Sequence, residues 1–210
     1  MKIVDIKKKG NKAIITKDDG STLELDLQLT ENISDDITNL DEQDIYALQE
    51  KSEYYATKNS ALRFLARRSH SIFEIRQKLL KKEFNESTID VIINELIQIG
   101  YLNDQKFAEA FVEARINYKY DGLSKIKAQL YKRGIAKDLI NEIISRKSED
   151  LEEELFQNAL ELAKRKQRQI ISRSSDEIPK QKLKEKLTLY LVNKGYSFTQ
   201  ISQVLKETVK

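Results

Sequence analysis

Hydrophobic residues recur at two different spacings along the chain, and the change of spacing separates its beginning from the rest. Between residues 2 and 28, three short apolar runs predict three β-strands. The runs are Ile3–Ile6, Ala13–Ile15 and Leu23–Leu27. Gly10-Asn11 and Asp19-Gly20, which lie between them, are typical of hairpin turns. We therefore predict a small β-meander that either packs on the helices or stays mobile.

One helical unit occurs three times in the remaining sequence. Residues 74–93 align without gaps with residues 125–144 and 186–205, at offsets of 51 and 112. The matched apolar positions are Ile75, Ile126 and Leu187; Leu79, Leu130 and Leu191; Ile89, Ile140 and Ile201; Ile92, Ile143 and Val204; and Ile93, Ile144 and Leu205. Positions four apart share one face of a helix, so each copy predicts a pair of amphipathic helices.

The residues between the paired helices predict where one helix ends and the next begins. Gly134 and Gly195 stand where a helix would end in a left-handed residue, whereas Glu83 occupies this place in the first copy. We therefore expect the helix before Glu83 to end by a different route. The second helices are expected to begin at residues that can accept a hydrogen bond from a free backbone N–H. These residues are Ser87, Asp138 and Thr199.

Each unit is expected to have a third helix before this pair. The three additional helices are predicted at Tyr54–Arg68, Asn103–Lys119 and roughly Leu151–Arg168, with a polar loop at Ser172–Glu177 and Pro179 near the next helix start. A linker is expected at Thr30–Leu40 and a short helix at about Asp41–Lys51.

These elements predict a mainly α protein: tandem three-helix repeats that form an elongated curved solenoid, with a small N-terminal β-meander. The predicted segments are 1–40 for the strand arm and linker, 41–53 for a connecting helix, and 54–102, 103–148 and 149–210 for the first, second and third repeats.

The composition narrows the classes of function. The 210 residues include one proline and six glycines, which favours long helices with few breaks, and no cysteine, which excludes disulfides and thiolate metal sites. No signal-peptide pattern and no apolar stretch long enough to cross a membrane is present, so we expect a cytoplasmic monomer without membrane contact. No phosphate-binding loop or nucleophile motif is found, so we expect no catalytic residue, no cofactor and no metal.

The single histidine, His70, is assigned a structural role. It precedes Ser71, which can cap a helix, and Glu74 stands at the reciprocal position of a capping box. We therefore expect His70 to contribute to capping or packing rather than to catalysis.

Charge is sorted into blocks along the chain, although the net charge is only +3. Basic and acidic side chains number 8 and 1 in residues 58–82, 5 and 1 in residues 121–137, and 9 and 3 in residues 164–186. Such blocks can neutralise phosphates or contact an acidic protein surface, and they can also be no more than solvated helix faces. Nearby aromatic residues, Tyr118, Tyr120 and Tyr131, are expected to pack rather than to stack on bases.

Several motifs in the sequence resemble those of a known family. The run from Leu65 to Leu79 resembles the first-repeat signature of RecX proteins, Gly100–Asp104 with Lys106–Ala108 resembles their most distinctive motif, and Ile126–Ile135 is similar to their second repeat. The resemblance covers roughly residues 54–208 and is looser in the third repeat. One departure is the turn Tyr120–Leu123, which lacks the proline that this family has before its second repeat.

The resemblance implies a non-catalytic modulator of the RecA recombinase. Such a protein binds the RecA–DNA filament, inhibits recombinase and ATPase activity, and acts in DNA repair, recombination and the SOS response. The contact residues that we predict for the filament and for single- or double-stranded DNA are the basic side chains Arg63, Arg67, Arg68, Arg76, Lys78, Lys82, Lys127, Lys132 and Arg133.

Two other classes of function remain open. A stand-alone helical nucleic-acid-binding module would bind DNA tightly without RecA and with a steep salt dependence. An unrecognised enzyme would turn over a nucleotide or nucleic-acid substrate.

Overall fold

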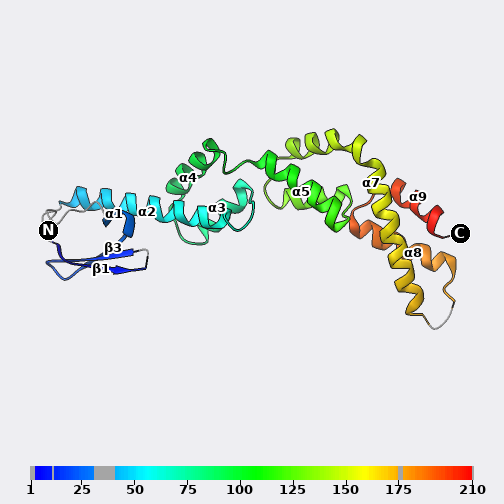
Figure 1. Ribbon diagram of the computed structural model, residues 1–210, viewed down its shortest axis with the longest axis horizontal. Coiled ribbons are helices and arrows are strands. Elements are labelled where there is room, and N and C mark those ends of the chain that lie inside the picture. The colour runs from blue at the N-terminus through cyan, green and yellow to red at the C-terminus, as the bar shows by residue number, and fades with distance from the viewer. Residues whose placement is uncertain (1–2, 11, 31–40, 175–176, 210) are drawn as a thin grey trace. The chain divides into compact units, whose positions relative to one another are not determined.

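The structure is a computed structural model that describes residues 3–10, 12–30, 41–174 and 177–209. The chain divides into two compact units, residues 1–102 and residues 103–210. Figure 1 shows that helices dominate both units and that strands occur only near the N-terminus among the described residues. The predicted mainly α class, with its three-helix repeats and small N-terminal sheet, is confirmed. The predicted linker at Thr30–Leu40 lies outside the described residues, apart from Thr30, which is the last residue of a short helix.

The first unit begins with the predicted β-meander. Strands β1 (Ile3–Lys9), β2 (Lys12–Lys17) and β3 (Thr22–Asp26) pair antiparallel in sequence order. The turn residues Gly10 and Gly20 have φ values of +62° and +81°, which glycine adopts without the steric cost that a side chain would bring. The three strands and both turns therefore lie where the apolar runs placed them.

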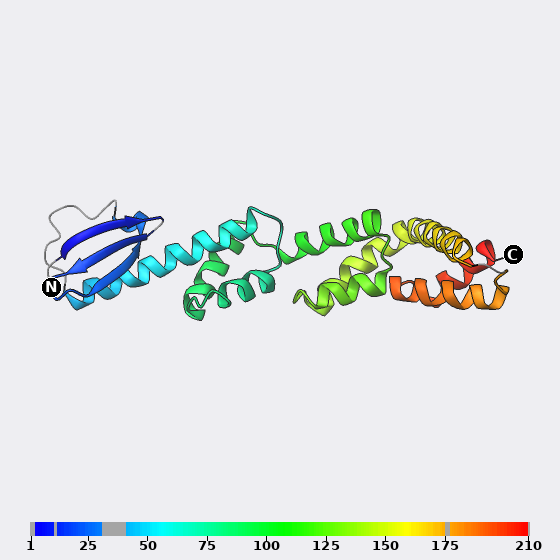
Figure 2. The same cartoon turned by 90° about the horizontal axis from the view of Figure 1, so that it is seen from below.

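The meander packs on the first long helix instead of standing apart from it. After a single turn, α1 (Leu27–Thr30), the chain continues into α2 (Glu42–Leu65), which lies along the sheet (Figure 2). The alternate residues Ala13, Ile15, Leu23 and Leu25 are buried, and Ile45 and Leu48 of α2 pack against this cluster. The Asp26 N–H also donates to Ser52 Oγ at 2.6 Å.

Helix α2 joins two helices that the sequence pattern separates. The short helix expected at Asp41–Lys51 and the helix expected from Tyr54 are one continuous element of 24 residues. No glycine or proline occurs between Asp41 and Leu65, so no residue there interrupts the backbone hydrogen bonds. Asp41 and Asp44 form a capping box that fixes the start of the helix.

The first three-helix domain combines the C-terminal half of α2 with α3 (Ile72–Leu80) and α4 (Glu86–Gln98). The second unit contains α5 (Asp104–Lys119), α6 (Leu123–Tyr131), α7 (Lys137–Ser172), α8 (Lys180–Lys194) and α9 (Phe198–Thr208). Helices α4, α7 and α9 begin at positions related by the same offsets as the sequence repeat. The aligned apolar positions of the repeat are buried, except for the partly buried Leu205.

Helix α7 is shared by the second and third domains. The sequence pattern predicts a separate helix from about Leu151, but the helix that begins at Lys137 continues for 36 residues. The segment between Ile144 and Leu151 contains no glycine or proline, so it tolerates helical backbone throughout. Figure 1 shows α7 running past both α8 and α9, against which it packs.

The predicted starts of the second helices are wrong by two residues. Helices α4, α7 and α9 begin after Asn85, Ala136 and Ser197, so the expected caps Ser87, Asp138 and Thr199 lie inside the first turn. Hydroxyl and acidic residues suit the first turn as well as the cap, because both positions lie near free N–H groups and the positive end of the helix dipole. Sequence alone therefore does not separate the two positions.

The expectation for Glu83 is also wrong. Glu83 has a φ of 62°, close to the 75° of Gly134 and the 91° of Gly195, so all three helices end through a left-handed residue. The backbone path is set by the next residue, Phe84, Ile135 or Tyr196, which turns back to pack against its domain's core. The first domain keeps this path although glycine is absent.

Candidate binding surfaces

The first group of predicted contact residues surrounds an aromatic ring on α2. The ammonium of Lys78 lies 4.7 Å from the centre of the Phe64 ring, and that of Lys82 lies 5.9 Å from it. These two lysines are four residues apart and so project from one side of α3 and the turn after it. Attraction to the ring face holds both cations at the surface without neutralising them.

Arg63 adjoins this group on the side of the β-meander. It lines a pocket of about 520 Å³ together with Lys82 and Phe84 and with Lys12 and Glu24 of the sheet. The Arg63 side chain is exposed and donates from Nε to the Asn59 carbonyl at 3.2 Å. The pocket also contains carboxylates, so its charge is mixed.

Two of the predicted arginines are engaged within the protein. Arg68 forms hydrogen bonds through both terminal nitrogens with the carboxylate of Glu74, at 3.0 and 3.2 Å. Arg76 forms an ion pair with Asp90. Pairs of this exposure contribute about 0–1 kcal/mol each to stability, but they lower the charge that each arginine presents to a partner. Arg67, by contrast, is exposed and makes no ion pair among the described residues.

His70 has the structural role that the sequence predicts. It is only 5 % exposed, its Nδ1 lies 2.8 Å from the Arg68 carbonyl oxygen, and its ring packs near Phe64. Burial lowers the pKa of His70 below its ordinary value, and the charge of Arg68 adds to this effect. Ser71 and Glu74 form the predicted capping box at the start of α3. His70 therefore packs as a neutral ring at neutral pH.

The second group lies in the second domain and repeats part of the first. Arg133 occupies the position equivalent to Lys82, and its guanidinium carbon lies 4.6 Å from the centre of the Phe111 ring on α5. Its Nη1 donates to the Gln129 carbonyl at 2.9 Å. Lys127 contacts Asn141 Oδ1 at 3.4 Å, and Lys132 is exposed. A cation above an aromatic ring of the first helix is thus common to both domains.

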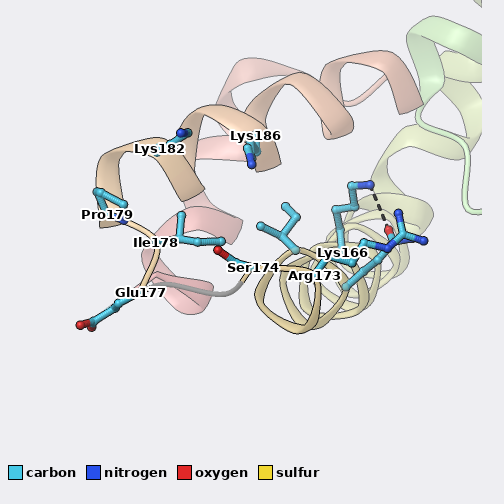
Figure 3. Close-up of a pocket in the computed structure, with 10 residues that line it drawn as sticks. Lys166, Arg173, Ser174, Glu177, Ile178, Pro179, Lys182 and Lys186 are labelled. Carbon is cyan, nitrogen blue, oxygen red and sulfur yellow. Dashed lines mark hydrogen bonds between the residues drawn. The ribbon is translucent and has the colours of Figure 1, made fainter.

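The nine predicted residues therefore form two groups, with six in the first unit and three in the second. A third basic group, absent from the predicted set, lies between α7 and α8 and includes Arg173 and Lys182 (Figure 3). The charge block at residues 164–186 is the signal that marks it in the sequence.

The turn Tyr120–Leu123, which lacks the family's proline, connects α5 to α6 and packs against the turn between α8 and α9 in the third domain. Gly122 donates its N–H to the Lys194 carbonyl at 2.8 Å, and a Cβ at Gly122 would lie 2.3 Å from the backbone of Gly195. The Tyr196 hydroxyl donates to the Tyr120 carbonyl at 3.0 Å. Burial raises the pKa of Tyr196, so this hydroxyl keeps its proton. The turn therefore depends on close backbone contact.

Buried charge supports the same turn. The Asp121 carboxylate is 2 % exposed and lies 2.8 Å from Lys125 Nζ and 3.2 Å from Arg115 Nε. Tyr120 is partly buried against the core of the second unit, as expected, and the guanidinium of Arg165 lies over its ring. Tyr118, by contrast, is 81 % exposed and does not pack. Tyr131 is also exposed, at 43 %, so the expectation that all three tyrosines pack is wrong for Tyr118 and for Tyr131.

Within the described ranges, no group of three or more histidine, cysteine, aspartate or glutamate side chains could hold a metal ion. None of the helices in the same ranges is both long and apolar enough to span a bilayer.

Three family models match the chain in succession. They describe the first, second and third three-helix domains of RecX and match residues 58–96, 103–144 and 152–205. The fold and the successive matches define a class of protein built from three tandem three-helix domains with basic surfaces.

Individual relatives agree with these models. A regulatory protein RecX from Clostridium acetobutylicum is 37 % identical over 158 residues, which cover 75 % of this chain and 71 % of the relative. A regulatory protein RecX from Clostridium perfringens is 32 % identical over 167 residues, covering 80 % and 75 %. The chain therefore belongs to the RecX family.

Solved structures show the same fold. A crystal structure of regulatory protein RecX matches with a TM-score of 0.69 and 21 % identity, and covers 98 % of both chains. The crystal structure of RecX from Lactobacillus salivarius matches with a TM-score of 0.63 and 24 % identity, covering 74 % of this chain and 96 % of that one.

Proposed function

We propose that this chain binds the RecA–DNA filament and mainly inhibits its recombinase and ATPase activities, acting in the cytoplasm as a non-catalytic regulator of DNA repair and recombination. The observation that carries the proposal is membership of a family whose members are named regulatory proteins. We also propose that the repeats at 54–102, 103–148 and 149–210 are its functional domains.

In the first domain, the proposed contacts are Lys78 and Lys82 over the Phe64 ring and the exposed arginines Arg63 and Arg67. Among the described residues, Arg63, Arg67, Lys78 and Lys82 form no ion pair, so they can meet acidic side chains or phosphates without first breaking an internal pair. In the second domain, Lys127, Lys132 and Arg133 are the proposed contacts. Arg68 and Arg76 remain in the proposed set, but each would have to exchange its carboxylate partner for the filament.

Inhibition of this kind requires binding energy that differs between filament states. A regulator changes the population of a state only by binding it more tightly than the alternatives. The proposal therefore predicts that inhibition requires the assembled filament and occurs at concentrations below those that coat bare DNA.

The test is the single-stranded-DNA-dependent ATPase of the cognate RecA, titrated with this protein at fixed salt. The double variant Arg67→Glu, Lys82→Glu is expected to raise the half-inhibitory concentration at least about tenfold, because two desolvated charge contacts together contribute about 1.4 kcal/mol or more. Both side chains are exposed, so the helical circular dichroism should not change.

The matched control is Lys51→Glu, Lys81→Glu, which makes the same change of net charge at exposed positions of the same unit. This control should inhibit like the wild type. Equal inhibition by wild type and the Arg67, Lys82 variant would refute the contact site. Inhibition that begins only when bare DNA is saturated would refute filament binding and favour a stand-alone nucleic-acid-binding module.

A further inference from the structure

The pocket of about 520 Å³ in the first unit lies where the β-meander meets the first three-helix domain. Leu25 and Asp26 of β3 line it from the sheet, and Phe84 lines it from the turn after α3. The first family model begins at residue 58, so the sheet and the first half of α2 are additions to the three matched domains. The volume lies within the range of roughly 300–1,000 Å³ that is usual for small-molecule sites.

One face of α2 runs along the whole pocket. The lining residues of this helix recur at intervals of three or four positions: Gln49, Ser52, Glu53, Ala56, Ser60 and Arg63. Residues at this spacing share one face of a helix, and the helix rises by about 21 Å from the first of them to the last. The pocket is therefore an elongated groove, and the order of these residues along α2 is also their order along the groove.

The end of the groove at Arg63 is cationic. Lys82 lies 5.9 Å from the centre of the ring of Phe64, the residue that follows Arg63, so both cations lie at this end. Both are exposed, and neither forms an ion pair with a described residue. A guanidinium and an ammonium without carboxylate partners favour an anion, and phosphate matches the donors of both groups.

The carboxylates that line the groove do not neutralise these two cations. Glu24 is paired with Lys12 at 2.6 Å, and Glu53 accepts hydrogen bonds from the backbone and side-chain nitrogens of Asn85 at 2.7 and 3.2 Å. Asp26 is 7 % exposed and lies beside Ser52, to whose Oγ its N–H donates. The groove is thus cationic at one end and rich in hydrogen-bond acceptors towards the other.

A buried hydroxyl and an apolar wall lie between the two ends. Ser60 is 4 % exposed and lines the groove, and its hydroxyl forms no hydrogen bond with any described residue. Buried polar groups normally have a partner, so a ligand in the groove would supply the one that Ser60 lacks. Leu25, Ala56 and Phe84 provide an apolar surface on which a flat ring can pack.

We propose that this groove binds a nucleoside phosphate. Its phosphate would lie at Arg63 and Lys82, its sugar would bond the hydroxyl of Ser60, and its base would pack on the apolar wall. Asp26 and Gln49 stand at the far end, where a carboxylate and an amide can bond the polar edge of a base. The sequence has no phosphate-binding loop, so side chains alone would hold the phosphate and the affinity should be moderate.

The experiment is isothermal titration calorimetry of the full chain with ADP and, separately, with UDP, in the absence of RecA and DNA. At least one nucleotide should bind with a dissociation constant below roughly 1 mM, the upper end of the range in which proteins hold metabolites. Adenosine and inorganic phosphate each make only part of the contacts and should bind at least about tenfold more weakly. Absence of binding by both nucleotides would overturn the proposal, as would phosphate or adenosine that binds as tightly as ADP.

Arg63→Ala should weaken nucleotide binding at least about tenfold, because it removes charge-assisted hydrogen bonds to the phosphate. The matched control is Arg67→Ala, which removes the same charge from an exposed position outside the groove. The control should bind like the wild type. Equal weakening in both variants would mean that only net charge matters, and the site would be lost.

Ala56→Leu tests the groove without changing any charge. The larger side chain fills the middle of the groove and should abolish binding, while Ala47→Leu, at an exposed position of the same helix outside the groove, should bind normally. Ser60→Ala should weaken binding without lowering the midpoint of unfolding, because its hydroxyl has no partner in the free protein. Wild-type affinity in Ala56→Leu, with unchanged helical circular dichroism, would place the nucleotide elsewhere and refute the site.

The proposal does not rest on the proposed regulation of RecA, because binding is measured without RecA and DNA. Arg63 and Lys82 belong to both proposed sites, so Ala56→Leu, which changes neither of them, is the variant that separates the two. It should lose the nucleotide and still inhibit the RecA ATPase. Failure of either proposal therefore leaves the other in place.

Discussion

Single residues at the ends of helices carry much of the specificity of this fold. Gly134 and Gly195 adopt left-handed backbone at no steric cost, whereas Glu83 adopts the same conformation with a side chain. A non-glycine residue in this region costs roughly 1–2 kcal/mol, offset in part by the lower entropy of its unfolded chain relative to glycine. The first domain therefore holds a strained residue at a position where its two sister domains do not.

Glu83→Gly is accordingly expected to stabilise the first unit by about 1 kcal/mol, because glycine relieves the strain of the left-handed backbone. The measurement is the denaturant midpoint of unfolding of the full chain. Glu83→Ala removes the same carboxylate but keeps a Cβ, and it should bring little gain. Equal stabilisation by both variants would show that the charge of Glu83, and not its backbone, is unfavourable.

At the scale of elements, close approach of two turns decides how the second and third domains meet. Gly122 begins the turn into α6, and its backbone lies against Gly195, which ends α8. The sequence repeat identifies Gly195 as a helix end but gives no reason for a glycine at position 122. Only the packing of one turn on the other explains Gly122, because any side chain there would overlap backbone.

Gly122→Ala is expected to destabilise the second unit by roughly 2–3 kcal/mol, since the added methyl would lie 2.3 Å from backbone atoms that have no rotamer to change. The thermal unfolding midpoint should fall accordingly. Ser124→Ala, at an exposed position just inside α6, should leave the midpoint unchanged. A wild-type midpoint for Gly122→Ala would mean that the two turns do not stay in contact in solution.

At the scale of the whole molecule, the hydrophobic cores follow the two units and not the three repeats. One core lies entirely within residues 103–210 and combines Ile140 and Ile143 with Leu155 and Ala159 along α7, while the first unit has cores of its own. A division at residue 148 would cut α7 and separate side chains that pack together. A division at residue 102 cuts neither a helix nor a core.

A fragment of residues 103–210 is therefore expected to fold alone and unfold cooperatively, whereas a fragment of residues 149–210 should lack a cooperative transition. The reason is that the shorter fragment loses the partners that bury Leu155 and Ala159. Circular dichroism monitored during thermal unfolding distinguishes the two. A sharp transition in the shorter fragment would contradict the shared core.

Interactions between residues close together in the sequence determined most of the fold. The offsets of 51 and 112, the alternating strands and the glycine turns identified the repeats, the meander and the family resemblance, because hydrophobic periodicity and turn chemistry act within a few residues. The basic blocks identified candidate binding residues for the same reason.

Tertiary structure alone decided the remainder. It joined the predicted helices into α2 and α7, placed Glu83 in a left-handed conformation, and paired Arg68 with Glu74 and Arg76 with Asp90. It also gathered Lys166, Arg173, Lys182 and Lys186 around one pocket. These outcomes depend on which side chains meet after the helices pack, and spacing along a single helix carries no information about the helix that will lie beside it.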